Sequence, residues 1–506
     1  MVTVYYDQDT NKCVIQNKKY SSGNFVSEIT GGKLTLWKND RLLLDKIPVS
    51  DIVDKAGTAY ASEAALETAL NNFFVDASDA AYWGGVAEAT YSYGILIDGN
   101  FSTPLVTRVG NLELHKTLPI HSLMRGCLLL DDGTVNYYLD PNDWSKKADG
   151  TAANHTGADG MVMVEIPEYY TIYRSIDDIR KEVRISQRPL PGYQLKPKRY
   201  VSAYKATVQR SNNKLASVIN TDADFRGGNN DATKDALPST QLGRSASNIS
   251  LTNFRAYARN RAAGTRWNCM TYDIKKSIFW LFAIEYGNLN SQAAVSAKDP
   301  VNGYMQGGLG NGVTNASSAE WNAFNGYYPF VPCGASNILG NKSGEVTYTA
   351  VDFEGTGINR NFTVSRYRGI ESPFGETHDW TDGILIDVKS VADGGTSTLY
   401  TTNDPSKFSS TDFANYIMRG LVSRSSGYVR NMIFGVEGDI IPTNVTGGST
   451  TYYADYFYTS VTESSLRGVY FGGAALDGAS AGLVYALSNS APSIATTNIG
   501  SRLCFV

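Results

Sequence analysis

Four acidic residues stand close together in the stretch RYRGIESPFGETHDWTDGI, which runs from residue 366 to 384. Carboxylates held roughly 5–10 Å apart across a sugar are the pair that hydrolyses a glycosidic bond. A glycan-degrading activity is therefore one hypothesis for this chain. Acidic clusters are also common in loops, and nothing in the sequence pairs this one with a substrate groove. The four candidates are Glu371, Glu376, Asp379 and Asp382.

Other kinds of catalysis find less support. The four histidines follow no GxSxG nucleophile pattern, and the glycine-rich segment GGLGNG at 307–312 lacks the GK[ST] ending of a phosphate-binding loop. The five cysteines are scattered with no CxxC pair, so a zinc site is not expected and buried free thiols are. These residues are His115, His121, His155, His378, Cys13, Cys127, Cys269, Cys333 and Cys504.

Two further features leave alternatives open. The segments DGILID (382–387) and DFRGGNND (224–231) offer the oxygen ligands that Ca²⁺ prefers, so a structural ion is neither predicted nor excluded. A run of arginines either forms a basic patch for anionic glycans or bridges to loop carboxylates, and we favour the bridges. The run consists of Arg255, Arg259, Arg261 and Arg266.

Composition indicates a multidomain protein rich in strands and loops. A chain of 506 residues exceeds one ordinary core, and a net charge of −4 argues against a nucleic-acid partner. The 48 glycines suit turns, and the 32 tyrosines suit strands and binding surfaces. The start of the chain lacks the pattern of a secretory signal, and SIFWLFAI (277–284) is too short to span a bilayer. We therefore expect synthesis in a cytoplasm and no membrane insertion.

The elements that must position these residues fall into three segments. Residues 1–50 read as a small β module, with strands at VTVYY, KCVIQ and KLTLW. Residues 51–90 contain SEAALETALNNFF, an amphipathic helix that packs either on copies of itself, as an oligomeric neck, or on the next domain. Residues 91–506 form one large unit.

The large unit has a definite order of elements. A strand signal, GMVMVEIPEYYTIYR, precedes two helices, SLTNFRAYARNRAAG, ending at Gly264, and TYDIKKSIFWLFAIEYG, ending at Gly287. Long Gly- and Asn-rich loops follow. The C-terminal third returns to short strands at YVRNMIFGV, RGVYFGG, AGLVYALS and IGSRLCFV, where alternation places Cys504 opposite Leu503 and Phe505.

Sequence words spread over residues 91–506 resemble a known family. They include VMVEIPEYY, FWLFAIEYGNLNSQA, RYRGIESPFG and the closing IGSRLCFV, in this order. They are similar to words in the fibre and receptor-binding proteins of Bacteroides phages and prophages, including crAss-like phages. The resemblance implies an α+β fold: a C-type-lectin-like domain with two helices, short strands and long loops. This domain type is shared with formylglycine-generating enzymes and with the variable proteins of diversity-generating retroelements.

The resemblance also implies where function lies. Formylglycine-generating relatives need a redox-active cysteine pair near the domain's C-terminal end, and here Cys504 stands there alone, so no enzymatic activity and no cofactor are expected. The variable proteins contact ligands through side chains in this C-terminal region, and we expect about half of the corresponding residues here to fill the core. They are Tyr452, Tyr453, Tyr456, Tyr458, Tyr470, Phe471, Tyr485, Ser488, Asn489 and Ser490.

If the chain is like that family, the acidic stretch at 366–384 has a structural role and is not a catalytic site. We expect Arg368 and Glu371 to form a buried pair, with Phe374 and Trp380 packing beside them. The implied protein is a head or tail fibre of a phage virion, displayed outside the particle. Residues 1–90 would bind other virion proteins, and the chain would be a homotrimer that recognises a host-surface glycan or protein. The alternatives are a virion-borne glycan-degrading enzyme and a purely structural decoration protein of the capsid or tail.

Overall fold

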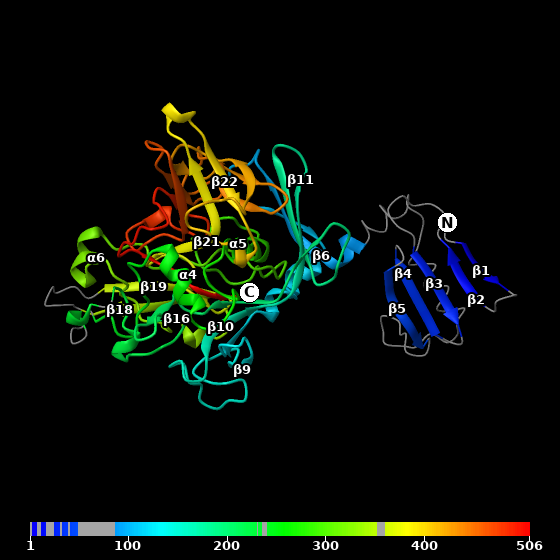
Figure 1. Cartoon of the computed structure of the whole chain (residues 1–506), viewed down its shortest axis with the longest axis horizontal. Coiled ribbons are helices and arrows are strands. Elements are labelled where there is room, and N and C mark those ends of the chain that lie inside the picture. Colours follow the sequence, from blue (N-terminus) through cyan, green and yellow to red (C-terminus); the bar gives the residue numbers. More distant parts are fainter. Residues whose placement is uncertain are drawn as a thin grey trace. The chain divides into compact units, whose positions relative to one another are not determined.

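A computed structural model describes residues 3–7, 12–16, 25–30, 33–38, 41–48, 87–229, 231–234, 240–351 and 360–506. The chain divides into two compact units, Met1–Thr90 and Tyr91–Val506 (Figure 1). The described strands of unit 1 form one sheet, and those of unit 2 form the others.

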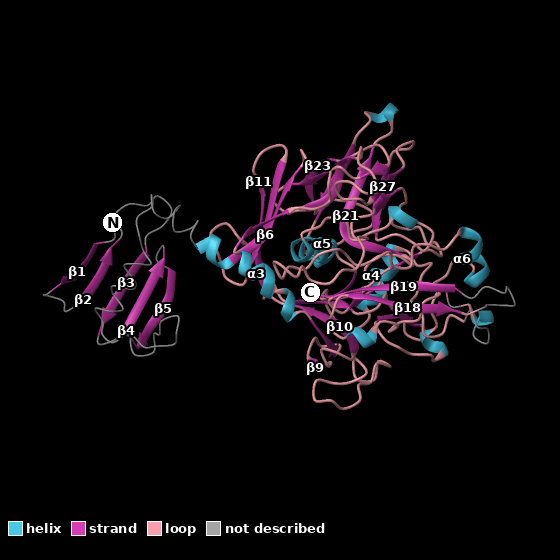
Figure 2. Cartoon of the chain, turned by 180° about the vertical axis from the view of Figure 1, so that it is seen from behind, coloured by secondary structure: helices cyan, strands magenta, loops and turns pink. Residues whose placement is uncertain are grey.

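Unit 1 contains an antiparallel sheet whose strands follow one another in chain order (Figure 2). The strands expected at VTVYY, KCVIQ and KLTLW are present, and FVSEIT and RLLLDKIP add two more. The helix expected within SEAALETALNNFF lies outside the described residues. The strands are β1 (Thr3–Asp7), β2 (Lys12–Gln16), β3 (Phe25–Thr30), β4 (Lys33–Lys38) and β5 (Arg41–Pro48).

A six-stranded sheet runs through the middle of unit 2 in the order β17-β31-β14-β10-β8-β9. Its strand β10 reads MVMVEI and is buried along its whole length. Alternate residues of a strand point to opposite faces, so Val162 and Val164 enter one hydrophobic cluster and Met161 and Met163 another. The strands are β8 (Arg125–Leu129), β9 (Val135–Tyr138), β10 (Met161–Ile166), β14 (Arg199–Ser202), β17 (Trp267–Cys269) and β31 (Leu503–Phe505).

The C-terminal strand β31 obeys the same alternation. Leu503 and Phe505 belong to one cluster and Cys504 to the other, as the sequence pattern predicts. Because β31 lies between β17 and β14, the last residues of the chain are locked into the sheet.

A five-stranded sheet, ordered β13-β11-β12-β6-β7, contributes side chains to the hydrophobic cluster that contains Val162 and Val164. The strand signal GMVMVEIPEYYTIYR resolves into two strands, β10 and β11, which belong to different sheets. The strands of this sheet are β6 (Ser92–Asp98), β7 (Thr107–Gly110), β11 (Tyr169–Ser175), β12 (Arg180–Ser186) and β13 (Gln194–Lys196).

The C-terminal third supplies every strand of the largest described sheet, ordered β23-β22-β21-β28-β29-β27-β24, with β30 beside β21. Within it β27 pairs in parallel with β29, and β29 pairs antiparallel with β28. The strands are β21 (His378–Val388), β22 (Ser397–Thr401), β23 (Ile417–Leu421), β24 (Gly427–Tyr428), β27 (Tyr456–Thr459), β28 (Ser465–Phe471), β29 (Ala486–Ser488) and β30 (Ile499–Gly500).

Smaller strand sets complete unit 2. They are β15 (Thr207–Gln209) with β16 (Lys214–Ala216), β25 (Asn431–Phe434) with β26 (Asp439–Asn444), and β18 (Gly344–Ala350), β19 (Arg360–Tyr367) and β20 (Ile370–Glu371).

The two predicted helices are present as α4 (Leu251–Arg259) and α5 (Tyr272–Tyr286). Helix α5 ends at Gly287 in the left-handed conformation, as predicted, whereas α4 ends at Asn260 rather than at Gly264. Every residue of α5 except Asp273 is buried, including the charged Lys275, Lys276 and Glu285. The helix lies within unit 2 and contacts β6, β12 and β21 (Figure 1).

Within the described part of unit 2, the structure also has helices α3 (Leu112–Thr117) and α6 (Ser318–Asn325), which were not predicted. Helix α6 interrupts the segment read as long loops. Its start carries a capping box, in which Ser317 and Glu320 each bond the other's backbone N–H.

Candidate functional site

The acidic stretch at 366–384 lies inside unit 2. All of its residues are buried except Arg368, which is half-buried. The stretch includes the end of β19, the short strand β20 and the first part of β21. A glycosidase pair must face a sugar in an open groove, and these carboxylates are enclosed by protein instead.

Asp379 and Asp382 are held by buried cations. Asp379 lies 2.9 Å from Lys205 Nζ and 3.5 Å from Arg502 Nε. Burial alone would raise the pKa of Asp379, but the attraction of Lys205 and Arg502 outweighs it and lowers that pKa. Asp382 Oδ1 accepts a hydrogen bond of 2.8 Å from Arg255 Nη2. Both carboxylates thus serve as counter-ions within the fold.

Glu371 and Glu376 bind backbone groups. Glu371 accepts bonds from the N–H of Gly334 at 2.8 Å and from the N–H and Oγ of Ser336 at 2.7 Å each. Glu376 Oε1 accepts a bond of 2.6 Å from the N–H of Val331. Burial raises the pKa of Glu376 to about 7. These contacts tie β20 and the segment before β21 to the loop at 331–336.

The expected pair between Arg368 and Glu371 is wrong. Arg368 and Gly369 form the turn between β19 and β20, both with positive φ, whereas Glu371 lies opposite Arg366 in the ladder. Because Arg368 lies in the turn and not in a strand, it has no cross-strand partner in the ladder. Arg368 therefore reaches α5, where its Nη2 donates to Glu285 Oε1 at 2.6 Å and its Nε to Oε2 at 3.0 Å.

The two aromatic framework residues are both fully buried but do not share a cluster. Phe374 packs in the core that contains α5. Trp380 packs in the core that contains α4 and stacks edge-on against Tyr470 at 4.8 Å. The stretch therefore connects two cores rather than surrounding one ion pair.

The remaining catalytic candidates are also structural. His115 and His121 are buried and bond backbone carbonyls, and desolvation lowers the pKa of each to about 4. His155 is half-buried, and His378 is buried with its Nε2 3.3 Å from Asp477. Four cysteines are buried free thiols: Cys127, Cys269, Cys333 and Cys504. The side chain of Cys13 lies outside the described residues.

The arginine run bridges to oxygens inside the fold, as we favoured, and forms no basic patch. Arg255 binds Asp382, Arg261 binds Asp131, and Arg259 donates to the carbonyl of Pro405. Arg266 donates to the carbonyl of Val506. Each guanidinium thus fixes a segment distant in sequence.

The ten predicted ligand-binding residues divide by burial. Tyr453, Tyr470, Phe471, Tyr485 and Ser488 are buried, so half of the set belongs to the core, as expected. The others are accessible: Tyr458 is 43% exposed, and Tyr452, Tyr456, Asn489 and Ser490 are half-buried.

Strand register explains this division. Tyr458 of β27 and Tyr470 of β28 both pair with Leu487 of β29, so these three residues lie in one row across three strands. The next row, Phe457, Ala486 and Phe471, faces the α5 core. In the row of Tyr458, Leu487 and Tyr470, the Tyr470 side chain packs in the core that contains α4. The Tyr458 side chain, at the other end of the row, is exposed to solvent.

Further aromatic rings extend this open end. Tyr428 of β24 stacks edge-on with Tyr456 at 5.1 Å, and Tyr456 lies 6.4 Å from Tyr485. Tyr470 donates a bond of 2.6 Å to Asn489. We call the accessible set Tyr428, Tyr456, Tyr458, Asn489 and Ser490 the tyrosine surface. Tyr428 was not predicted, because only its pairing with Tyr456 brings it here.

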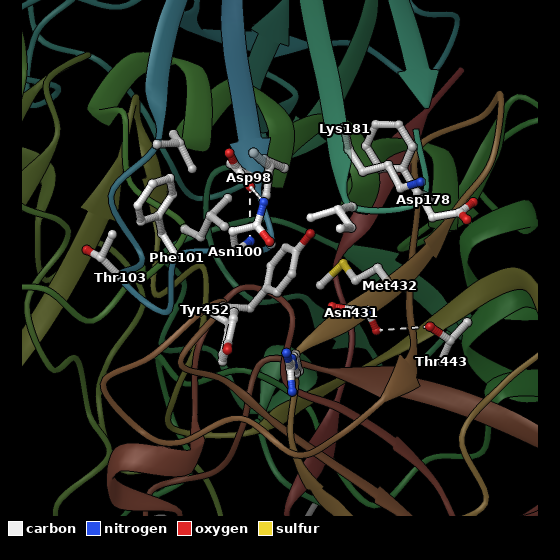
Figure 3. A pocket seen from close by; sticks show the side chains of 18 of the residues that line it. Asp98, Asn100, Phe101, Thr103, Asp178, Lys181, Asn431, Met432, Thr443 and Tyr452 are labelled. Carbon is white, nitrogen blue, oxygen red and sulfur yellow. Dashed lines mark hydrogen bonds between the residues drawn. The ribbon is translucent and has the colours of Figure 1, made fainter. Parts of the chain in front are cut away.

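Tyr452 and Tyr453 belong to a different place. They line a cavity of about 380 Å³ between the β6–β7 loop, the β11–β12 turn and the β25–β26 hairpin (Figure 3). Figure 3 shows the Tyr452 ring between Asn100 on one side and Met432 on the other. The predicted set therefore covers two separate surfaces.

No group of three or more His, Cys, Asp or Glu among the described residues is arranged to hold a metal ion. Among the same residues, no helix combines the length and apolarity needed to cross a membrane.

Comparisons with known proteins add little. No family model matches the sequence, and no curated protein matches it either. Two solved structures, named Major Tropism Determinant U1 Variant and Major Tropism Determinant P3c Variant, are similar to this chain at 11% identity. Each alignment covers 99% of this chain and 93% of the other, with a TM-score of 0.20. That score is too low to indicate a common fold, so the similarity supports no conclusion about this chain.

Proposed function

We propose that this chain is a non-enzymatic fibre protein of a phage virion, on the head or the tail, and that unit 2 recognises the host surface. Residues 1–90, which make up unit 1, attach the chain to other virion proteins, and three copies form the fibre. The sequence resemblance to fibre and receptor-binding proteins of Bacteroides phages supports this assignment.

The observation that carries the proposal is the tyrosine surface. Tyrosine offers a large contact area at low entropic cost, and neighbouring Asn and Ser offer adaptable hydrogen bonds. Here Tyr458 is 43% exposed, although the neighbouring strand β29 is buried along its length. The rings of Tyr428 and Tyr456 continue the surface. A rigid sheet that displays tyrosines is suited to binding a glycan or a protein.

The burial of the four carboxylates supports a binder over a glycan-degrading enzyme. Asp379 and Asp382 are neutralised by internal cations, and Glu371 and Glu376 bind backbone N–H groups. Incubating the purified chain with Bacteroides capsule and measuring new reducing ends tests this point. Release of reducing ends would contradict the assignment as a non-enzymatic binder.

Binding to intact cells tests the proposal itself. The fluorescently labelled full chain is titrated against a panel of Bacteroides strains. We expect saturable binding to some strains and a large loss with Tyr458→Ala, whose side chain is exposed enough to remove without unfolding. The control is Tyr170→Ala, a half-buried tyrosine on β11 of another sheet. Equal loss with both variants, or binding to no strain, would contradict the proposal.

A further inference from the structure

We propose that the cavity around Tyr452, shown in Figure 3, is a second binding site and that it takes a neutral pyranose sugar. The site lies entirely within unit 2. It goes beyond the proposed function, which rests on the tyrosine surface.

The size and walls of the cavity suit a small ligand. Its volume of about 380 Å³ falls within the range of about 300–1,000 Å³ usual for small-molecule pockets. Phe101 and Leu105, at 64% and 63% exposed, and Ile179 stand on its walls. Exposed apolar side chains at one concave site do not stabilise the fold, and they give a ligand with an apolar face something to pack on.

Tyr452 is held in place at a cost to the backbone. Tyr452 and Ala454 both have positive φ, at 56° and 60°, a conformation that costs a non-glycine residue roughly 1 kcal/mol or more. The N–H of Tyr452 donates a bond of 2.6 Å to the carbonyl of Ser102, on the opposite loop. The strained loop therefore fixes the tyrosine against the β6–β7 loop, which carries Phe101.

The polar groups of the cavity are balanced in charge. Asp98 and Asp178 offset Lys181 and Arg430, so the lining has no net formal charge. No ion pair is found for any of these four within the described part of the chain. Arg430 lies 5.1 Å over the Tyr452 ring. A balanced set of donors and acceptors favours a neutral, hydroxylated ligand over an anion or a cation.

Hydrogen-bonding capacity matches sugar hydroxyls. Asp98 Oδ1 already accepts the N–H and the Nδ2 of Asn100, at 3.0 and 2.9 Å, which orients the carboxylate and leaves Oδ2 as an acceptor. Arg430 supplies donors, and Asn431 offers an amide at the exposed rim. Sugar hydroxyls both donate and accept hydrogen bonds, so a sugar site needs partners of both kinds. The aromatic faces of Tyr452 and Phe101 meet the apolar face of a pyranose ring.

Saturation-transfer NMR on the full chain tests this site with methyl glycosides of glucose, galactose, mannose, fucose and N-acetylglucosamine. Glucuronate and glycerol serve as an anionic and an acyclic comparison. We expect at least one neutral glycoside to bind in the millimolar range. Phe101→Ala and Arg430→Ala should each weaken that binding by roughly tenfold, a loss of about 1.4 kcal/mol.

Two controls make the result specific. Arg188→Ala removes another exposed arginine that stacks on a tyrosine, at 4.2 Å over Tyr91, and should leave sugar binding unchanged. Tyr458→Ala should also leave it unchanged. No signal from any neutral glycoside, a signal from glucuronate alone, or binding that survives both Phe101→Ala and Arg430→Ala would overturn the proposal.

The two proposals fail separately. Cell binding that depends on Tyr458 without any sugar binding would refute the sugar pocket and leave the fibre assignment standing. Sugar binding that depends on Phe101 and Arg430, with no binding to cells, would support the sugar pocket and refute the fibre assignment.

Discussion

The ion pair between Arg368 and Glu285 is predicted to be among the strongest single contacts of unit 2. Glu285 is completely buried, and the Arg368 side chain is 19% exposed. The pair has two-pronged geometry, with contacts of 2.6 Å and 3.0 Å to the two carboxylate oxygens. Removing one partner of such a pair leaves an uncompensated buried charge, which costs about 3–5 kcal/mol.

The two single variants should differ in a defined direction. Arg368→Ala leaves a carboxylate that water cannot reach, whereas Glu285→Ala leaves a guanidinium at the edge of solvent. We therefore expect Arg368→Ala to be the more destabilising. The double variant removes both charges and should cost less than the sum of the two by about 2–3 kcal/mol.

Urea unfolding of the full chain measures these differences. Five buried tryptophans report on unit 2, namely Trp144, Trp267, Trp280, Trp321 and Trp380. The matched control is Lys116→Ala, which breaks a pair of similar length, 2.7 Å, whose side chains are 40% and 73% exposed. Exposed pairs are worth about 0.5 kcal/mol. If Arg368→Ala costs no more than this control, or if the double variant costs the full sum, the reasoning is refuted.

Three further predictions concern the fold and the assembly. Glu371→Ala removes the acceptor for the backbone N–H groups of Gly334 and Ser336. Because these donors are then buried without a partner, the free energy of unfolding should fall by about 3 kcal/mol. An unchanged urea unfolding curve would contradict this. Burial raises the pKa of Glu376 to about 7 from 4.5. The folded protein therefore binds this proton more tightly than the unfolded chain does. The contribution of the protonated carboxyl to the free energy of unfolding is complete below about pH 4.5. It is lost as pH rises through about 7, by up to about 3 kcal/mol. Glu376→Gln should remove this part of the pH dependence, and parallel stability curves for the variant and the parent would contradict the shift. Light scattering of the full chain should give the mass of a trimer, and a monomer would refute the proposed fibre assembly.

Local signals were sufficient for several elements of the fold. Helix α5 could be predicted because its apolar run ends at Gly287. The alternation of Leu503, Cys504 and Phe505 correctly predicted that Cys504 packs in a different core from the other two. Helix α6 could have been found too, because Ser317 and Glu320 have the spacing of a capping box.

The sequence did not predict which residues far apart in the chain contact each other. Arg368 was assigned to Glu371, three residues away, but its partner lies on α5 at residue 285. The turn conformation at Arg368 and Gly369 directs that side chain, and the sequence does not reveal which helix it meets. For the same reason one member of the tyrosine surface was missed: Tyr428 joins Tyr456 only through strand register. The cavity was missed as well, because Tyr452 is tied to the β6–β7 loop through the carbonyl of Ser102, which is far away in sequence.

Competition for adsorption is the most direct measurement of the proposed function. Soluble full chain is added to host cells before phage particles that carry this protein, and the fraction of adsorbed phage is measured. We predict that the parent chain and Tyr170→Ala block adsorption in a dose-dependent manner, and that Tyr458→Ala does not. Undiminished adsorption at a saturating concentration of the parent chain would contradict a receptor-binding role.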